Sequence, residues 1–259
     1  MQRRSFSAPL LALCFLLLAT ASLEAQQFKA LLVTETAGWH HPSITAGIPA
    51  LQALARRHEF QLDRQQQAIP LSDKALENYD VVIFLSTTGD IFTDEEQAAF
   101  ERFIQSGKGY VGIHAASDTE YEWPWYTRLV GHMFKIHPRN QTAMLEVVDP
   151  DFPGLERWPE RMLWTDEWYD FQEATVEDLN YILTVDESTY DAKVKWGENA
   201  SEGMGDFHPL AWYHEYDGGR AFYTALGHID DTYQDDFFLQ HLYGGIYWAA
   251  TGHGLKTKK

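Results

Sequence analysis

Three histidines stand at the ends of apolar segments, where their side chains could act on a ligand. His114 directly follows a short apolar run, His228 follows the run at residues 219–226, and His208 precedes the run at residues 209–216. Imidazole titrates near neutral pH and binds metal ions, so such rings serve in proton transfer or as metal ligands. We predict that His114 and His228 are catalytic and that His208 supports them. Three purely structural histidines are the alternative.

Polar residues near the other strand ends could position a substrate. Asp230 lies two residues after His228, where a carboxylate can orient an imidazole ring. We predict it as part of the catalytic set, and a surface acid at a turn is an equal interpretation. Asp90 and His40 each come shortly after an apolar run, and we predict that both contact the substrate. The simpler alternatives are a capping role for Asp90 and an ordinary loop position for His40.

A bound metal ion is one of two interpretations of the histidines. Two or three imidazoles with a carboxylate form a set typical of zinc. For that case we predict His114, His208 and His228 as ligands, with Asp166 or Glu167 completing the shell. The chain has no HExxH pattern, so proton transfer by the same rings without a metal is the alternative. In both cases we expect Asp166 and Glu167 to bind the substrate.

Aromatic side chains are dense in the segments that follow the predicted strands. Among them, Trp123 and Trp168 are the residues for which we predict a substrate contact. Pyranose rings stack their C–H faces on flat aromatic side chains while carboxylates bind their hydroxyl groups. This combination predicts a carbohydrate ligand. Burial of both tryptophans in the core is the alternative.

Several kinds of chemistry are disfavoured by what the sequence lacks. Its only cysteine, Cys14, lies in an N-terminal segment that we expect to be removed, which leaves no cysteine nucleophile, disulfide or thiolate metal site. No Gly-x-Gly-x-x-Gly pattern is present, which disfavours a dinucleotide-dependent redox enzyme. The net charge of −18 disfavours nucleic acid as a partner, because its phosphates would be repelled. We expect a small carbohydrate as the partner, and a homo-oligomer is possible.

The first half of the chain predicts parallel strands covered by helices. Short, nearly continuous apolar runs are typical of strands buried on both faces, and the segments between them have helical spacing. We predict strands at residues 28–34, 80–86 and 109–114, and helices at residues 42–57 and 93–106. This alternation gives right-handed βαβ units in a doubly wound sheet with helices on both faces. Ligands bind such sheets beyond the carboxyl ends of the strands, where His114 and His228 fall.

The second half predicts an antiparallel extension of the same sheet. We expect strands at residues 143–148, 180–185, 209–216 and 219–226, and a closing helix at residues 237–250. A tight turn at Asp217 and Gly218 joins the last two strands as a hairpin. This register places His208 beside His228, with His214 roughly 20 Å further along the strand. The whole is a flavodoxin-like, mostly parallel α/β sheet in a single domain at residues 26–259.

Several strings in order resemble a known family. Residues 112–119 (GIHAASDT) resemble the nucleophile elbow of class I glutamine amidotransferases with histidine in place of cysteine, and residues 223–230 (YTALGHID) resemble their strand with the catalytic histidine. Together with the strings at residues 87–90, 122–126, 165–169 and 203–212, they resemble the ThuA-like (trehalose utilisation) family across residues 28–252. The resemblance implies a class I glutamine amidotransferase-like fold and a role in the metabolism of disaccharides or keto-sugars. Loss of the cysteine rules out thioester chemistry.

The first 25 residues are typical of a cleavable signal peptide. Arg3 and Arg4 precede an apolar run that is too short to span a bilayer, and small residues follow at Ala21 and Ala25. We predict removal of residues 1–25, no membrane segment afterwards, and a periplasmic or secreted location. The predicted activity is that of a sugar hydrolase or isomerase/lyase. A non-catalytic carbohydrate-binding or sensing module is the alternative.

Overall fold

The computed structural model describes residues 26–65 and 69–254 of the 259-residue chain. The predicted signal peptide at residues 1–25 therefore lies outside the described residues. Within the described ranges, no helix is both long enough and apolar enough to cross a membrane.

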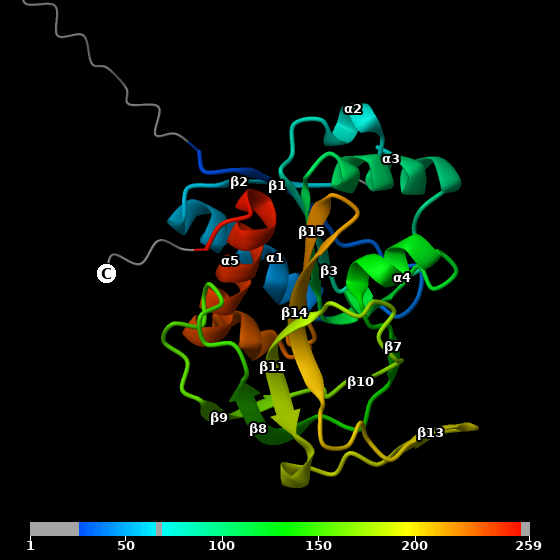
Figure 1. The fold of residues 1–259 in the computed structure, drawn as a ribbon, viewed down its shortest axis with the longest axis vertical. Coiled ribbons are helices and arrows are strands. Elements are labelled where there is room, and N and C mark those ends of the chain that lie inside the picture. Colours follow the sequence, from blue (N-terminus) through cyan, green and yellow to red (C-terminus); the bar gives the residue numbers. More distant parts are fainter. Residues whose placement is uncertain (1–25, 66–68, 255–259) are drawn as a thin grey trace, which may run out of the picture.

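A nine-stranded mixed sheet forms the centre of the molecule (Figure 1). In spatial order, its strands are β2 (Gln61–Arg64), β1 (Lys29–Val33), β3 (Val81–Leu85), β5 (Gly109–Ile113), β15 (Gly219–Thr224), β14 (Pro209–Tyr216), β11 (Asn180–Asp186), β8 (Gln141–Val147) and β9 (Arg161–Asp166). The strands from β2 to β15 are parallel, and those from β14 to β9 continue the sheet with antiparallel pairing. The antiparallel extension was predicted. The sheet is mixed, whereas a mostly parallel sheet was predicted. Part of the difference is β9, an edge strand that the sequence did not predict because it has no continuous apolar run.

Helices cover both faces of this sheet. They are α1 (Ile44–Arg57), α2 (Asp73–Leu76), α3 (Asp94–Gln105), α4 (Pro124–Val130) and α5 (Asp236–Thr251). In Figure 1, α1 and α5 contact each other on one side of the strands, whereas α3 and α4 lie on the other side. Thr93 and Glu96 form a capping box at the start of α3, which satisfies backbone N–H groups that the helix itself cannot.

Two glycines allow the helices to approach the sheet closely. A Cβ atom at Gly109 would lie 2.2 Å from the carbonyl oxygen of Ala249 in α5, and one at Gly219 would lie 2.6 Å from that of Ile104 in α3. Because β5 and β15 are neighbours, helices on opposite faces both pack against the strands that end at the predicted histidines.

The hairpin of β14 and β15 turns where the sequence predicts. Asp217 and Gly218 have φ angles of +48° and +88°, as a two-residue hairpin turn of the primed type requires. The register pairs His214 with Ala221 and Ala211 with Thr224. The start of β14 therefore lies beside the end of β15.

Short strand pairs and single turns of 3₁₀-helix account for much of the remaining structure. The pairs are β4 (Thr88–Gly89) with β6 (Asp118–Thr119), β7 (Phe134–Ile136) with β10 (Asp170–Phe171), and β12 (Val194–Trp196) with β13 (Asn199–Ser201). The 3₁₀ turns are η1 (His114–Ser117), η2 (Glu187–Thr189) and η3 (Asp230–Gln234). The sequence did not predict these elements, because so few residues carry no measurable periodicity.

Candidate functional site

His114 sits in a sharp turn at the end of β5. Its φ angle of +52° lies in the left-handed region, which costs a non-glycine residue about 1–2 kcal/mol. The next residues, Ala115 and Ala116, are small and buried. The Nδ1 atom of His114 lies 2.8 Å from the carbonyl oxygen of Ala225. Since a carbonyl only accepts hydrogen bonds, Nδ1 carries a proton and the neutral ring presents the lone pair of Nε2.

Asp166 holds the turn that presents His228. This turn follows β15 and contains Gly227 at a φ angle of +117°. One carboxylate oxygen of Asp166 accepts a hydrogen bond from the backbone N–H of Gly227 at 3.0 Å, and the other accepts from that of His228 at 3.1 Å. The side chain of Asp166 is completely buried. The structure places it behind His228, as a positioning residue, which corrects the predicted contact with substrate or metal.

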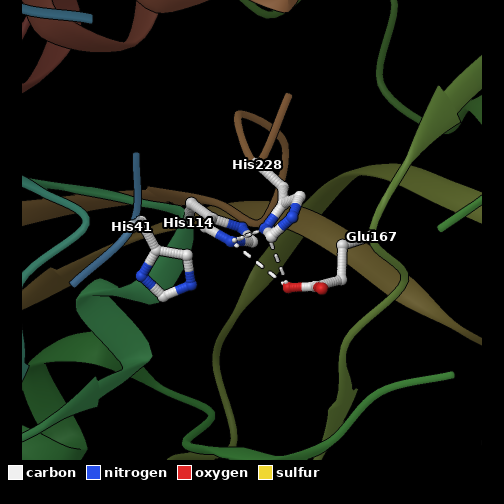
Figure 2. A group of neighbouring side chains, drawn as sticks. All are labelled: His41, His114, Glu167 and His228. Carbon is white, nitrogen blue, oxygen red and sulfur yellow. Dashed lines mark hydrogen bonds and ion pairs between the residues drawn. The ribbon is translucent and has the colours of Figure 1, made fainter. Parts of the chain in front are cut away.

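Glu167 joins the two histidines in one cluster (Figure 2). Its Oε2 atom lies 3.0 Å from His228 Nδ1 and 3.5 Å from His114 Nε2. Those two nitrogens are 3.2 Å apart. Glu167 Oε2 is buried, and among the described residues it has no hydrogen-bond partner of acceptable geometry. It therefore faces the space between the two rings.

Three further side chains surround this cluster. His41 is buried, and its ring lies edge-on to that of His114 with the centroids 4.8 Å apart. The Tyr169 hydroxyl oxygen lies 2.9 Å from His114 Nε2 and 3.5 Å from His41 Nε2. His137 Nδ1 lies 3.1 Å from Glu167 Oε1. His137 thus contacts Oε1 of Glu167, whereas Oε2 faces His114 and His228.

The protonation equilibria favour an ionised Glu167 carboxylate beside a neutral His41 ring. Burial, followed by the charges of His114 and His228, lowers the pKa of His41 to about 3. Burial raises the pKa of Glu167, but its interactions with His114 and His228 outweigh burial and hold this pKa well below its usual range. Burial lowers the pKa of His228, and Glu167 more than reverses that effect. Near neutral pH, His41 is therefore neutral and Glu167 charged, the forms that bind metal ions.

The cluster fits a divalent metal ion. One ligand atom from each of His41, His114, Glu167 and His228 lies within 4.8 Å of all the others. Ligand atoms about 2.0–2.2 Å from a shared ion are roughly 3.0–3.5 Å apart. The three distances among His114, His228 and Glu167 fall in this range. The hydrogen bond from His114 Nδ1 to a carbonyl is the outer contact that metal-binding histidines usually make.

A cavity of about 380 Å³ opens onto this cluster. Its wall includes Trp39 and Trp196, which are 70% and 44% exposed. The other lining residues are His41, Asp118, Phe134, His137, Glu167, Tyr169 and His228. A larger hollow of about 570 Å³ lies beside β2, but no residue of the cluster lines it. We place the site at the smaller cavity, because convergent titratable groups distinguish a functional pocket better than volume does.

His208 does not join this cluster, contrary to the prediction. It is buried in a separate group with Asp170 and Glu187. Its Nδ1 atom lies 2.7 Å from Glu187 Oε1, and its Nε2 atom lies 2.8 Å from the carbonyl oxygen of Tyr169. Both ring nitrogens are therefore engaged away from His114 and His228. His41 takes the place that was expected for His208.

Five other predicted residues also lie away from the cavity wall. Trp123 and Trp168 are buried, at 7% and 0% exposure, so the alternative interpretation as core residues holds for both. Asp230 and Asp90 are exposed, and neither lines the cavity. His40 lines the hollow beside β2 instead. The core positions of the two tryptophans contradict their predicted substrate contacts. The other three side chains are not brought to the cavity, although the charge of Asp230 contributes to raising the pKa of His228.

The cavity contains functional side chains that sequence reasoning missed. His41 directly follows the predicted His40, and only the loop conformation decides which of the two faces inward. Tyr169 belongs to a string that was noticed, although no role was predicted for its hydroxyl group. His137 and Trp196 carried no signal, because each lies in or beside a strand too short to be recognised.

Comparisons with known proteins agree on the family and the fold. The family model for ThuA, described as trehalose utilisation, matches residues 29–249. A ThuA-like protein from Bacteroides uniformis ATCC 8492 has a TM-score of 0.71 at 22% identity, over 87% of this chain and 92% of that chain. One from Parabacteroides merdae ATCC 43184 has a TM-score of 0.67 at 21% identity, over 89% and 92%.

A more distant likeness involves a larger enzyme. A β-galactosidase from Bacillus circulans sp. alkalophilus has a TM-score of 0.56 at 14% identity, over 90% of this chain but only 32% of that chain. At such identities, each of these solved structures shows a shared fold and no more. No curated protein matches the chain.

Proposed function

Because the chain belongs to the ThuA family, described as trehalose utilisation, we propose that it is an exported enzyme acting on a disaccharide or a keto-sugar. The observation that carries this proposal is the convergence of His41, His114, Glu167 and His228 in one cluster, of which all but the fully buried His114 line the cavity. The strand order β2-β1-β3-β5-β15 supports a flavodoxin-like origin of the parallel half, in which ligands bind at the carboxyl ends of the strands. The predicted signal peptide supports export.

The walls of the cavity suit a sugar. Trp39 and Trp196 offer flat apolar faces on which the C–H groups of a pyranose can stack. Asp118 supplies a carboxylate for hydroxyl groups, since it lines the same cavity. The volume of about 380 Å³ lies at the small end of ligand pockets, which favours one or two sugar rings over a polymer.

The floor of the cavity suits metal-assisted acid–base chemistry. His114, His228 and Glu167 would hold a divalent ion such as zinc, with His41 within reach as a further ligand. A bound ion supplies Lewis-acid polarisation of a carbonyl or a bound water. The Tyr169 hydroxyl, 2.9 Å from His114 Nε2, is placed to exchange a proton with a sugar oxygen. These parts serve a hydrolase or an isomerase/lyase.

The test is turnover of disaccharides and their keto forms by the purified mature protein supplied with zinc. We expect product from the wild type and turnover slower by about 10²–10⁴-fold in His114→Ala and Glu167→Gln. His41→Ala and His40→Ala form a matched pair, because only His41 faces the cavity. We expect the His40 variant to keep its activity.

Two outcomes would contradict this function. Equal turnover by the wild type and His114→Ala would remove the role assigned to the cluster. Tight binding of intact sugar with no product, measured by calorimetry over hours, would favour the non-catalytic binding module instead.

A further inference from the structure

A second group of buried ligand-type side chains lies apart from the cavity cluster. Asp170 begins β10, Glu187 begins η2, and His208 directly precedes β14. One ligand atom from each lies within 4.8 Å of the other two. The group meets beside Ser201, the last residue of β13. Three separate parts of the chain therefore converge next to the β12–β13 hairpin.

The His208 ring places a lone pair against a carboxylate. Its Nε2 atom lies 2.8 Å from the carbonyl oxygen of Tyr169 and must carry a proton, because a carbonyl only accepts. In the neutral ring, the Nδ1 lone pair then lies 2.7 Å from Glu187 Oε1. Their repulsion is relieved by a proton on either atom, or by a metal ion bound to both, for which the two atoms would lie slightly farther apart. The carbonyl contact is the one that fixes the ring of metal-binding histidines.

Asp170 favours the metal ion over the proton. Its side chain is 1% exposed, and neither carboxylate oxygen has a hydrogen-bond partner of acceptable geometry among the described residues. Ser201 and His208 lie near enough to stabilise its charge, but the ring nitrogens of His208 are already directed to Glu187 and Tyr169. Burial raises the pKa of Asp170 more than the nearby Ser201 hydroxyl lowers it, because an ionised carboxylate with so few partners is costly away from water. One proton on His208 cannot neutralise two carboxylates, whereas a divalent ion can.

We propose that Asp170, Glu187 and His208 form a second divalent-metal site, which fixes the β12–β13 hairpin beside the substrate cavity. One imidazole and two carboxylates are a donor set that suits zinc. Glu187 also accepts hydrogen bonds from the backbone N–H groups of Met204 and Gly205, in the segment that follows the hairpin. The site uses no residue of the cavity cluster, so it does not depend on the proposed function.

The hairpin matters because it carries Trp196 to the cavity. The Trp196 ring packs edge-on against His137, with the centroids 4.5 Å apart. Ser201, at the other end of the hairpin, lies beside Asp170. An ion bound at Asp170 would hold the base of the hairpin and, with it, one aromatic wall of the cavity. The second site would thus strengthen substrate binding without touching the substrate.

The test is the zinc stoichiometry of the metal-free mature protein, measured by calorimetry and elemental analysis. We expect two equivalents in the wild type and one in His114→Ala, which loses the cavity cluster. In His114→Ala, the further change Asp170→Asn should weaken the remaining site at least about a hundredfold. The matched change Asp178→Asn, at an exposed aspartate outside both clusters, should leave that site intact.

The outcomes for the two sites can be distinguished. A His114→Ala protein that binds no zinc overturns the second site, whatever the wild type binds. One equivalent that persists in His114→Ala and disappears in Asp170→Asn supports the second site and contradicts a metal at the cavity cluster.

A second measurement avoids variants that fail to fold. Lys193 and Lys195 are exposed on and next to β12, where trypsin can cleave. In His114→Ala protein, zinc bound at the second site should slow this cleavage about tenfold. An unchanged cleavage rate at saturating zinc overturns the proposal.

Discussion

Replacing Asp166 with asparagine tests which acid holds His228 in place. Asp166 is buried and accepts hydrogen bonds from two successive backbone N–H groups of the turn, whereas Asp230, two residues after His228, is exposed. Asparagine keeps the shape of the side chain but has only one accepting oxygen. Its NH₂ group would face a backbone N–H that now donates to the carboxylate. We therefore expect Asp166→Asn to destabilise the protein and to displace His228.

The size of the expected destabilisation follows from the hydrogen bonds that Asp166→Asn would lose. The Asp166 Oδ2 atom accepts from Gly227 N–H at 3.0 Å, and Oδ1 accepts from the N–H groups of His228 and Glu167 at 3.1 and 3.0 Å. A hydrogen bond to a charged group contributes about 1.5–3 kcal/mol. Losing one or two of them predicts a fall of about 2–4 kcal/mol in the free energy of unfolding. Asp230→Asn, as the matched control, should change it by less than about 0.5 kcal/mol.

Two measurements separate positioning from general stability. Urea unfolding at neutral pH gives the change in the free energy of unfolding. The charge of Asp166 contributes to raising the pKa of His228, so an NMR titration should show this pKa falling in Asp166→Asn. Zinc affinity should fall by about 10–100-fold, as for other groups that orient a metal ligand. If Asp230→Asn matches or exceeds Asp166→Asn in these measurements, the assignment of Asp166 as the anchor is refuted.

Three other perturbations have expected outcomes. Glu167→Gln should lower the pKa of His228 in an NMR titration, because Glu167 is the main influence that raises it; an unchanged pKa would contradict the ion pair. Burial lowers the pKa of His241 from 6.5 to about 3, so the unfolded chain binds an extra proton between these values and stability falls as the pH drops. From pH 8 to pH 5 this loss is about 2 kcal/mol in urea unfolding, and His241→Leu should remove that part of the pH dependence. Trp196→Ala should weaken sugar binding by about 1 kcal/mol in calorimetry, and an unchanged affinity would remove this residue from the cavity wall's function.

The regular part of the fold was predictable because its signals are local. Continuous apolar runs predicted β1, β3 and β5, and the Asp217–Gly218 turn fixed the register that pairs His214 with Ala221. His114 and His228 could be expected at one edge because each follows a parallel strand, and β5 and β15 are indeed neighbours. By contrast, β9 has exposed residues alternating with buried ones and lies at the edge of the sheet, so its pattern is faint.

The site was less predictable, because side-chain direction decides it. His40 and His41 are adjacent and chemically identical, yet one is exposed and the other is buried against His114. His208 does lie at the start of β14, as predicted, but its ring is drawn to Glu187, which reaches it from η2. The direction of such a side chain depends on partners that are distant in sequence, so the spacing of residues along the chain does not predict it.

The segment 166–170 shows how a single stretch of chain serves both clusters. It connects the end of β9 to the start of β10, and its successive side chains alternate between the cavity and the interior. Glu167 and Tyr169 line the cavity, whereas Asp166, Trp168 and Asp170 are buried away from it.

This alternation explains why two of the residues chosen from this segment were misplaced. Asp166 anchors the turn of His228, Trp168 packs in the core, and Asp170 faces Glu187 and His208. Adjacent carboxylates such as Asp166 and Glu167 cannot face the same site in an extended chain. An expectation that alternate residues of this segment face the same side would have selected Glu167 and Tyr169 together as cavity residues. The same geometry connects the clusters, because Tyr169 contacts His114 through its hydroxyl group and His208 through its carbonyl oxygen.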